Sequence, residues 1–143
     1  MDPGKSRVLI VEDDDRLRSL IERNLTARGH QVREAATVAE ALTALRQELP
    51  DLLILDVNLP DGSGWDVLRQ TRVPVEVRVL VLTAVPVSPR RLGEFRPLAY
   101  LPKPFPLEAL LRLAENRERT VDESAPSPIV VASPLAGEPR PSR

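Results

Sequence analysis

Short apolar runs alternate with helically patterned segments along most of this chain. Residues 8–11 (VLIV) and 52–55 (LLIL) are continuously apolar, which is typical of strands that are covered on both faces. After the first run, Leu17, Ile21 and Leu25 recur at helical spacing until Gly29 ends the pattern. On this basis we expect five strands, at 7–11, 31–35, 51–56, 77–82 and 98–101.

Polar residues and prolines indicate where the intervening helices begin and end. Thr37 and Glu40 have the spacing of a capping box, which opens a helix that ends at Pro50. Pro106 stands at the start of the last helix, whose leucines share one face. The β-α unit is thus repeated five times, which predicts an α/β fold with a doubly wound parallel sheet. Sites in such sheets lie outside the carboxyl ends of the strands.

Polar residues follow four of the expected strands: Glu12, Asp13 and Asp14 the first, Asp56 the third, Thr83 the fourth and Lys103 the fifth. Acids from two strands that face one space would repel each other unless a cation neutralised them, and carboxylate oxygens suit Mg²⁺. A metal, a lysine, a hydroxyl and a carboxylate that can form an acyl phosphate are the groups that phosphoryl transfer requires. Each residue alone has an ordinary interpretation, such as helix-start charge or a solvated loop lysine, but their conjunction favours a site.

Composition fits one globular domain. The chain has 143 residues, of which 42% are apolar and 29% are charged, and it has no cysteine for disulfides or thiolate metal sites. A net charge of −1 gives no electrostatic reason to expect direct contact with nucleic acid. No apolar run is long enough for a membrane span, and the N-terminus lacks a signal-peptide pattern. We therefore expect a soluble, cytoplasmic protein with no membrane contact.

Proline is the over-represented residue, with fifteen prolines against six glycines. Five of these prolines lie in residues 120–143, a segment that also has four serines and no helical periodicity, so we expect a disordered tail. Residues 1–6 are expected to be an N-terminal extension, which leaves a single domain at 7–119. Within the tail, residues 128–131 (PIVV) fit either a strand-addition motif or, the favoured interpretation, a chance cluster.

Four motifs in this order resemble one known family. The segments VLIVEDD at 8–14, LDVNLPDGSG at 55–64, LTA at 82–84 and KPF at 103–105 are similar to the receiver domain of two-component response regulators. The resemblance covers about residues 6–119. It implies a five-stranded flavodoxin-like sheet in the order 2-1-3-4-5 and, because no output domain follows, a receiver of the stand-alone type.

The resemblance also implies the roles of the acidic residues. Asp56 accepts a phosphoryl group from a histidine kinase or a phosphotransfer protein, and Glu12 and Asp13 form an acidic pair beside it. The side chains of Asp13 and Asp56 and the backbone carbonyl of Asn58 then hold Mg²⁺. The register of the acidic run comes from the family pattern alone, because the spacing equally allows Asp13 with Asp14.

Four further residues are implied to contact the phosphoryl group or respond to it. Lys103 pairs with one phosphate oxygen, the Thr83 hydroxyl donates to another, and the Ala84 N–H lies nearby. As Thr83 moves, Tyr100 rotates inward and changes a protein-binding surface on the fourth and fifth β-α units. An ordinary edge-strand aromatic is the alternative for Tyr100. The family also implies a cis peptide bond between Lys103 and Pro104.

Residues 85–97 depart from the family pattern. Ser88 and Pro89 can start a helix there, but Gly93 and Pro97 limit it to at most two turns. We therefore expect a degraded fourth helix. Our hypothesis is that this face does not form the symmetric dimer of many DNA-binding relatives and serves another contact.

Three other functions compete with this interpretation. A phosphatase with an aspartyl nucleophile needs a second acid two residues after Asp56, where Asn58 stands, so we expect no enzyme beyond the receiver's own phosphotransfer and dephosphorylation. A dinucleotide site at 62–64 (GSG) lacks the third glycine. A pseudo-receiver that is never phosphorylated and acts as a protein-interaction module is the remaining alternative. In either case we expect output through a downstream protein target.

Overall fold

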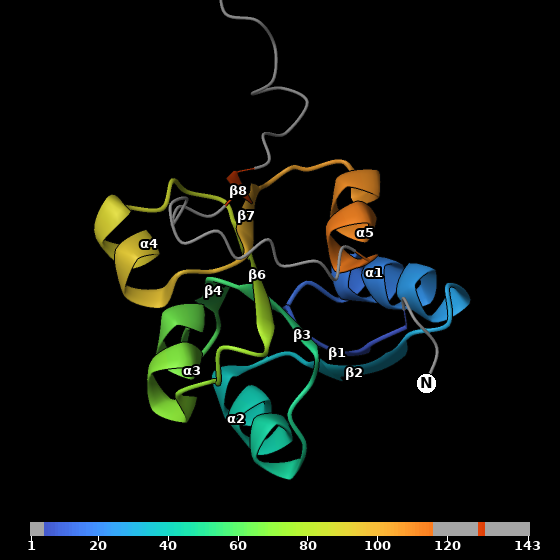
Figure 1. Ribbon diagram of the computed structural model, residues 1–143, viewed down its shortest axis with the longest axis horizontal. Helices are drawn as coiled ribbons and strands as arrows, with labels where there is room; N and C mark the ends of the chain where they lie inside the picture. The colour runs from blue at the N-terminus through green and yellow to red at the C-terminus, as the bar shows by residue number, and fades with distance from the viewer. Residues whose placement is uncertain (1–4, 116–128, 131–143) are drawn as a thin grey trace, which may run out of the picture.

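The computed structural model describes residues 5–115 and 129–130 (Figure 1). The paired strands of its main sheet are parallel and follow the order β2-β1-β3-β6-β7-β8. These strands are β1 (Arg7–Val11), β2 (Gln31–Ala35), β3 (Leu52–Asp56), β6 (Arg78–Thr83), β7 (Ala99–Pro102) and β8 (Ile129–Val130). The first five positions match the predicted order 2-1-3-4-5, which confirms the doubly wound, flavodoxin-like α/β fold.

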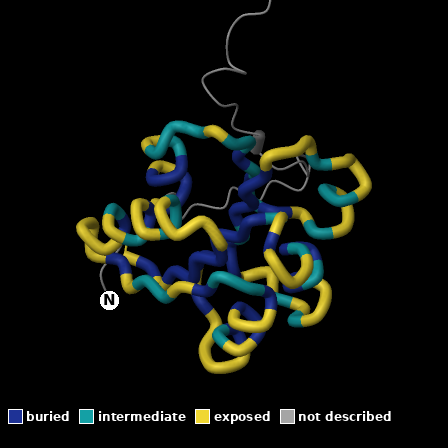
Figure 2. Tube along the Cα trace, turned by 180° about the vertical axis from the view of Figure 1, so that it is seen from behind, coloured by how far each residue is buried: buried dark blue, intermediate teal, exposed yellow. Residues whose placement is uncertain are grey.

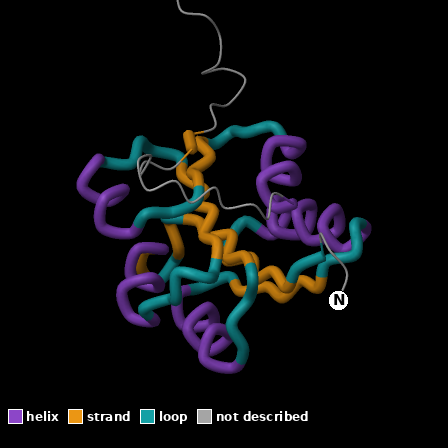
Figure 3. Tube along the Cα trace, viewed as in Figure 1, coloured by secondary structure: helices purple, strands orange, loops and turns teal. Residues whose placement is uncertain are grey.

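Helices cover both faces of this sheet (Figures 1 and 3). In the described part of the chain they are α1 (Asp15–Ala27), α2 (Val38–Gln47), α3 (Gly64–Thr71), α4 (Pro89–Phe95) and α5 (Leu107–Glu115). Side chains of α2, α3 and α4 pack with one cluster of strand residues, and those of α1 and α5 pack with the other. The sheet is therefore the middle layer of three, as the continuously apolar strands predict.

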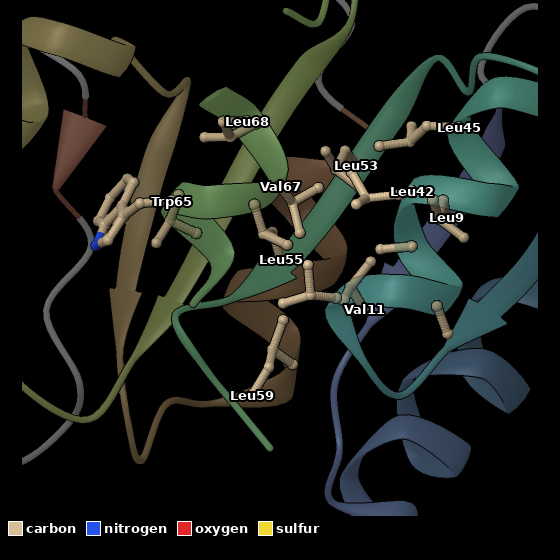
Figure 4. Packing of buried hydrophobic residues seen from close by; sticks show 14 of the residues in the cluster. Leu9, Val11, Leu42, Leu45, Leu53, Leu55, Leu59, Trp65, Val67 and Leu68 are labelled. Atoms are coloured by element: carbon tan, nitrogen blue, oxygen red, sulfur yellow. The ribbon is translucent and has the colours of Figure 1, made fainter. Parts of the chain in front are cut away.

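The central strand β3 is buried at every position. Leu53 and Leu55 pack on the side of α2 and α3 (Figure 4), whereas Leu52 and Ile54 pack on the side of α1 and α5. Burying each of these side chains stabilises the fold by about 1.5–3 kcal/mol. Figure 2 shows the resulting pattern, in which buried strands run inside a shell of exposed helix surface. The buried strand β3 thus fixes the position of Asp56, its last residue.

A small hairpin that the sequence did not indicate separates β3 from α3. It consists of β4 (Asn58–Leu59) and β5 (Gly62–Ser63), which pair in antiparallel fashion. Strands of two residues carry too little pattern to be recognised. The hairpin returns the chain to Asp56, where Gly64 begins α3. A Cβ added at Gly64 would lie 2.4 Å from the Asp56 carbonyl oxygen, so this close approach requires glycine.

Side-chain caps define where the helices begin. Thr37 accepts the Glu40 N–H at 3.0 Å as predicted, but the Glu40 carboxylate accepts the N–H of Ala36 instead of that of Thr37. Asp61, in the hairpin turn, accepts the Val38 N–H at 2.7 Å. That hydrogen bond is the main reason why the pKa of Asp61 is lowered. The hairpin after β3 and the helix before it are thus linked at the edge of the site.

The fourth helix is short and lightly attached. It spans seven residues, with Ser88 as its cap and Pro89 in its first turn, which confirms the prediction of at most two turns. None of its residues is buried. A Cβ added at Gly93 would meet nothing within 4 Å, so this glycine lies on an open surface.

The tail requires a correction. Ile129 and Val130 lie in the segment predicted to be disordered, yet they form β8, in register with Ala99 and Tyr100 of β7. Two β-branched residues favour a strand, and the edge of β7 offers unpaired backbone groups. Residues 1–4, 116–128 and 131–143, and with them the rest of the predicted tail and of the 128–131 patch, lie outside the described residues. No helix in the described segments is long and apolar enough to cross a membrane.

Candidate functional site

Four strand ends meet at one edge of the sheet and form the candidate site. Glu12 directly follows β1, Asp56 is the last residue of β3, Thr83 is the last residue of β6, and Lys103 directly follows β7. The Lys103 N–H donates to the Thr83 carbonyl at 2.7 Å, which ties the two neighbouring strand ends together. The peptide bond between Lys103 and Pro104 is cis.

An acidic cluster occupies this edge. Carboxylate oxygens of Glu12, Asp13 and Asp56 all lie within 4.8 Å of one another. Glu12 and Asp56 are buried, whereas Asp13 is exposed. The Lys103 ammonium donates to Glu12 Oε1 at 3.1 Å and to Asp56 Oδ2 at 3.4 Å. Four of the residues singled out in the sequence are therefore brought together, as opposite charges across one pocket.

Burial dominates the electrostatics of this pocket. It raises the pKa of Glu12 to about 7; the Asp14 N–H works against this shift, and the neighbouring Asp56 charge adds to it. Burial alone would lower the pKa of Lys103, but its hydrogen bond to Glu12 and the charges of Asp56 and Glu12 outweigh that effect and raise it. The ammonium therefore stays charged, while one acid sits at the edge of ionisation near neutral pH.

The structure separates the two candidates for the acid that pairs with Asp13, which are Glu12 and Asp14. Asp14 is the N-cap of α1, and its carboxylate accepts the N–H groups of Arg16 and Leu17 at 3.0 and 3.2 Å. Asp13 carries the carboxylate that joins Glu12 and Asp56. Spacing alone left these alternatives open, because both residues lie between a strand and a helix.

Asn58 and Ala84 flank Asp56 and Thr83. The Asn58 N–H donates to Asp56 Oδ1 at 3.3 Å, which helps to orient that carboxylate. Ala84 is exposed at the site's rim, next to Thr83. The role of the Asn58 carbonyl as a metal ligand stays a prediction.

Thr83 ends β6 and Tyr100 lies on β7, as the sequence predicts. The Thr83 hydroxyl is bonded within its own loop, and the Tyr100 ring is half-buried. The Thr83 hydroxyl donates to the Val85 carbonyl at 2.6 Å and accepts the Val85 N–H at 3.0 Å. Tyr100 is half-buried on β7 and packs against the cluster that contains Trp65. Their predicted movement stays a prediction.

Arg18 is a contributor that sequence reasoning missed. Its guanidinium donates to the Glu12 carbonyl at 2.8 Å and forms ion pairs with Asp15 at 2.7 Å and Glu34 at 2.9 Å. It therefore ties the loop that carries the acidic residues to α1 and β2. The i,i+3 spacing of Asp15 and Arg18 was visible in the sequence, but the contact with the loop depends on the third dimension.

An apolar groove adjoins the acidic cluster. It has a volume of about 570 Å³ and runs from α1 to the segment after β7, with Leu17, Leu20, Phe105 and Leu107 among its lining residues. Lys103 and Asp14 form its polar end. Through Lys103, which contacts Glu12 and Asp56, the groove places an apolar surface next to the acidic cluster.

Comparison with known proteins gives the family. The family model of the response regulator receiver domain matches residues 8–115. The chain is 38% identical over 140 residues to the response regulator MprA of Mycobacterium ulcerans (strain Agy99), a match that covers 93% of this chain. The chain belongs to the response regulator receiver family. It spans 60% of the length of MprA.

Solved receiver domains have the same fold. The non-phosphorylated HemR receiver domain of Leptospira biflexa matches with a TM-score of 0.70 and 32% identity, over 81% of this chain and 95% of that one. The receiver domain of the sensor histidine kinase PA1611 of Pseudomonas aeruginosa PAO1 matches with a TM-score of 0.68 and 26% identity, over 81% and 98%. That second structure holds a magnesium ion in its active-site cleft.

Proposed function

We propose that this chain is a phosphoacceptor receiver in which Asp56 takes a phosphoryl group from a histidine kinase or a phosphotransfer protein. The observation that carries the proposal is the buried Asp56 carboxylate, which lies among Glu12, Asp13 and the Lys103 ammonium. In the transfer, an Asp56 oxygen attacks phosphorus and the bond from phosphorus to the donor's imidazole nitrogen breaks. That nitrogen keeps the electron pair, and Asp56 becomes an acyl phosphate.

The residues present fit Mg²⁺. Glu12, Asp13 and Asp56 offer hard carboxylate oxygens from one pocket, the donor type this ion prefers. Asp13 and Asp56 would hold the ion, together with the Asn58 carbonyl, and Glu12 would complete the acidic pair. When bound, the ion spreads the negative charge of the transferring group.

The chain's own residues stabilise the product. Phosphorylation replaces a single charge with a larger group that carries about −1.5 to −2. Lys103, already 3.4 Å from Asp56 Oδ2, would pair with a phosphoryl oxygen, and the Thr83 hydroxyl and the Ala84 N–H would donate to others. In this proposal Tyr100 follows Thr83 and alters a surface that a downstream protein binds.

The apolar groove supplies a place for the phosphodonor protein. Leu17, Leu20 and Phe105 line it, and Leu20 is 38% exposed, so the groove can bury apolar side chains of a partner beside Asp56. We propose that the protein works in the cytoplasm through protein contacts, without direct nucleic-acid binding and without turnover of an external substrate. The net charge of −1 supports the part that concerns nucleic acid.

Intact mass spectrometry after incubation with acetyl phosphate or phosphoramidate and Mg²⁺ tests the proposal. We expect the wild-type chain to gain about 80 Da, the mass of a phosphoryl group. Asp56→Asn should abolish the gain. Asp51→Asn is the matched control, because Asp51 precedes the opposite end of β3, and it should be phosphorylated normally. A folded wild-type chain that gains no mass would support the pseudo-receiver alternative instead.

A further inference from the structure

The Thr83 hydroxyl forms its hydrogen bonds within its own loop. It has one proton, which it donates to the Val85 carbonyl, and its oxygen accepts the Val85 N–H. Thr83 therefore cannot donate to a phosphoryl group on Asp56 until it releases the Val85 carbonyl. Whatever holds Val85 in place also controls this donor.

The loop after Thr83 leads into α4 with little freedom. Pro86 and Pro89 each fix one backbone dihedral and restrict the residue before them. Ser88 accepts the Arg91 N–H at 3.2 Å and so fixes the first turn of α4. Val85 is 55% exposed, so close packing of its side chain does not hold it in place. A displacement of Val85 is thus carried into α4 instead of being absorbed in the loop.

Trp65 of α3 forms the surface on which α4 rests. Its ring stacks on that of Phe95, with centroids 5.1 Å apart and planes inclined by 20°. The Arg91 guanidinium lies 5.6 Å from the Trp65 ring centroid, and that of Arg69 lies 5.4 Å from the Phe95 centroid. Since α4 has no buried residue, this stack takes the place of the aliphatic packing that holds the other helices.

A cavity of about 160 Å³ connects the stack with Thr83. Trp65, Thr83, Val87 and Arg91 are among its lining residues. The space adjoins the loop from Val85 to Ser88, so this loop can shift without displacing side chains of the sheet. The hydroxyl, the loop and the stack therefore share one deformable region.

We propose that Trp65 is a positioning residue of the site, which acts through α4 and the loop on Thr83. By stacking on Phe95 it stabilises the arrangement in which the Thr83 proton is bonded to Val85. This inference rests on the proposed phosphoacceptor function. Because a phosphoryl group needs the other arrangement, the stack and phosphoryl binding oppose each other, and weakening one strengthens the other.

Isothermal titration calorimetry with beryllium fluoride, a phosphoryl mimic, in the presence of Mg²⁺ tests this coupling by measuring the affinity for the mimic. We expect Phe95→Ala to bind the phosphoryl mimic about three- to tenfold more tightly than wild type. Phe95→Tyr keeps the stack and should restore the wild-type affinity. Arg90→Ala is the matched control on the exposed side of α4 and should change nothing. Circular dichroism checks that each variant is folded, and Phe95→Leu replaces the alanine variant if that one unfolds.

A second measurement separates coupling from plain structural support. Trp65 is the single tryptophan of the chain, so its emission should change when the mimic binds to wild type and should stay constant in Thr83→Ala. In the Thr83→Ala background, Phe95→Ala should no longer tighten binding, because the two residues act through one element. Equal affinities of wild type and folded Phe95→Ala for the mimic would overturn the proposed role of Trp65 and leave the proposed phosphoacceptor function intact. A wild-type chain that does not bind the mimic at all would overturn the proposed function as well.

Discussion

At the scale of single residues, the site is a balance between burial and charge at Glu12. The side chain is fully buried, and burial raises its pKa from 4.5 to about 7. The Lys103 ammonium donates to this carboxylate and offsets part of the cost of its burial. The protonation state of Glu12 should therefore change near neutral pH.

Stability should therefore fall as the pH rises from about 4.5 to about 7 in the absence of Mg²⁺. In this window the folded protein holds a proton at Glu12 that the unfolded chain has released, so unfolding is favoured by each increase in pH. Thermal unfolding between pH 4.5 and 7.5 measures this, and Mg²⁺ should raise the midpoint more at pH 7.5 than at pH 5.

The control for this pH effect is Glu12→Gln, which keeps the shape of the side chain and cannot ionise. The decline between pH 4.5 and 7 should be smaller in this variant than in wild type. Parallel curves for the two proteins would show that another group is responsible.

At the scale of elements, strand ends and helix caps divide the acidic run between structure and chemistry. Asp14 caps α1, Asp15 pairs with Arg18, and Asp13 joins the cluster at Asp56. Neighbouring residues of one type thus have different tasks, because each leaves the backbone in a different direction at the turn from β1 to α1. A substitution at each position should reveal its task.

We expect Asp14→Ala to destabilise the fold by about 1 kcal/mol, the usual loss for an N-cap, and to leave Mg²⁺ affinity within about threefold of wild type. Asp13→Ala should do the opposite. It removes a carboxylate from the cluster, so Mg²⁺ affinity should fall at least about tenfold while stability without metal stays equal or rises. Urea unfolding measures the free energy of unfolding of each variant, and Mg²⁺ titration measures its affinity for the ion. Loss of Mg²⁺ binding in Asp14→Ala instead would reverse the assignment.

At the scale of the whole molecule, the edge strand of the sheet next to β7 comes from the distant C-terminal segment. β8 pairs with β7 at Ala99 and Tyr100. Backbone groups of β7 on this side would otherwise lie at an open edge, which invites pairing with other chains. The β8 strand therefore protects the edge that carries Tyr100.

Replacing Val130 with proline should open this edge, because proline has no N–H for the ladder. We expect faster hydrogen exchange at amides of β7 and unchanged exchange at amides of β3, which lies inside the sheet and serves as the internal control. Nuclear magnetic resonance resolves both sets. Equal exchange rates for β7 in the two proteins would show that β8 does not protect it in solution.

Much of the fold and of the candidate site could be predicted from the local pattern of residues. The period of apolar residues predicts the strands and helices, Ser88, Pro89 and Pro97 predict the short α4, and the motifs around Asp56 and Lys103 indicate the family. These features depend on residues a few positions apart, which share one turn or one pleat. The two-residue strands of the hairpin were not predicted, because so short a segment has no period. For β8, the apolar residues at 128–131 indicated a strand only as the less favoured interpretation.

The pattern of apolar residues along the chain is enough to predict the alternation of strands and helices, and hence the edge of the sheet where polar residues gather. The packing of the folded chain determines that Glu12, and not Asp14, joins Asp13 in the cluster, and that Lys103 contacts Glu12, 91 positions away, and Asp56, 47 positions away. It also decided that Trp65 stacks on Phe95 and that Thr83 is bonded to Val85. The physical reason is that propensity acts along the chain, whereas these contacts depend on how the sheet packs elements that lie far apart in sequence.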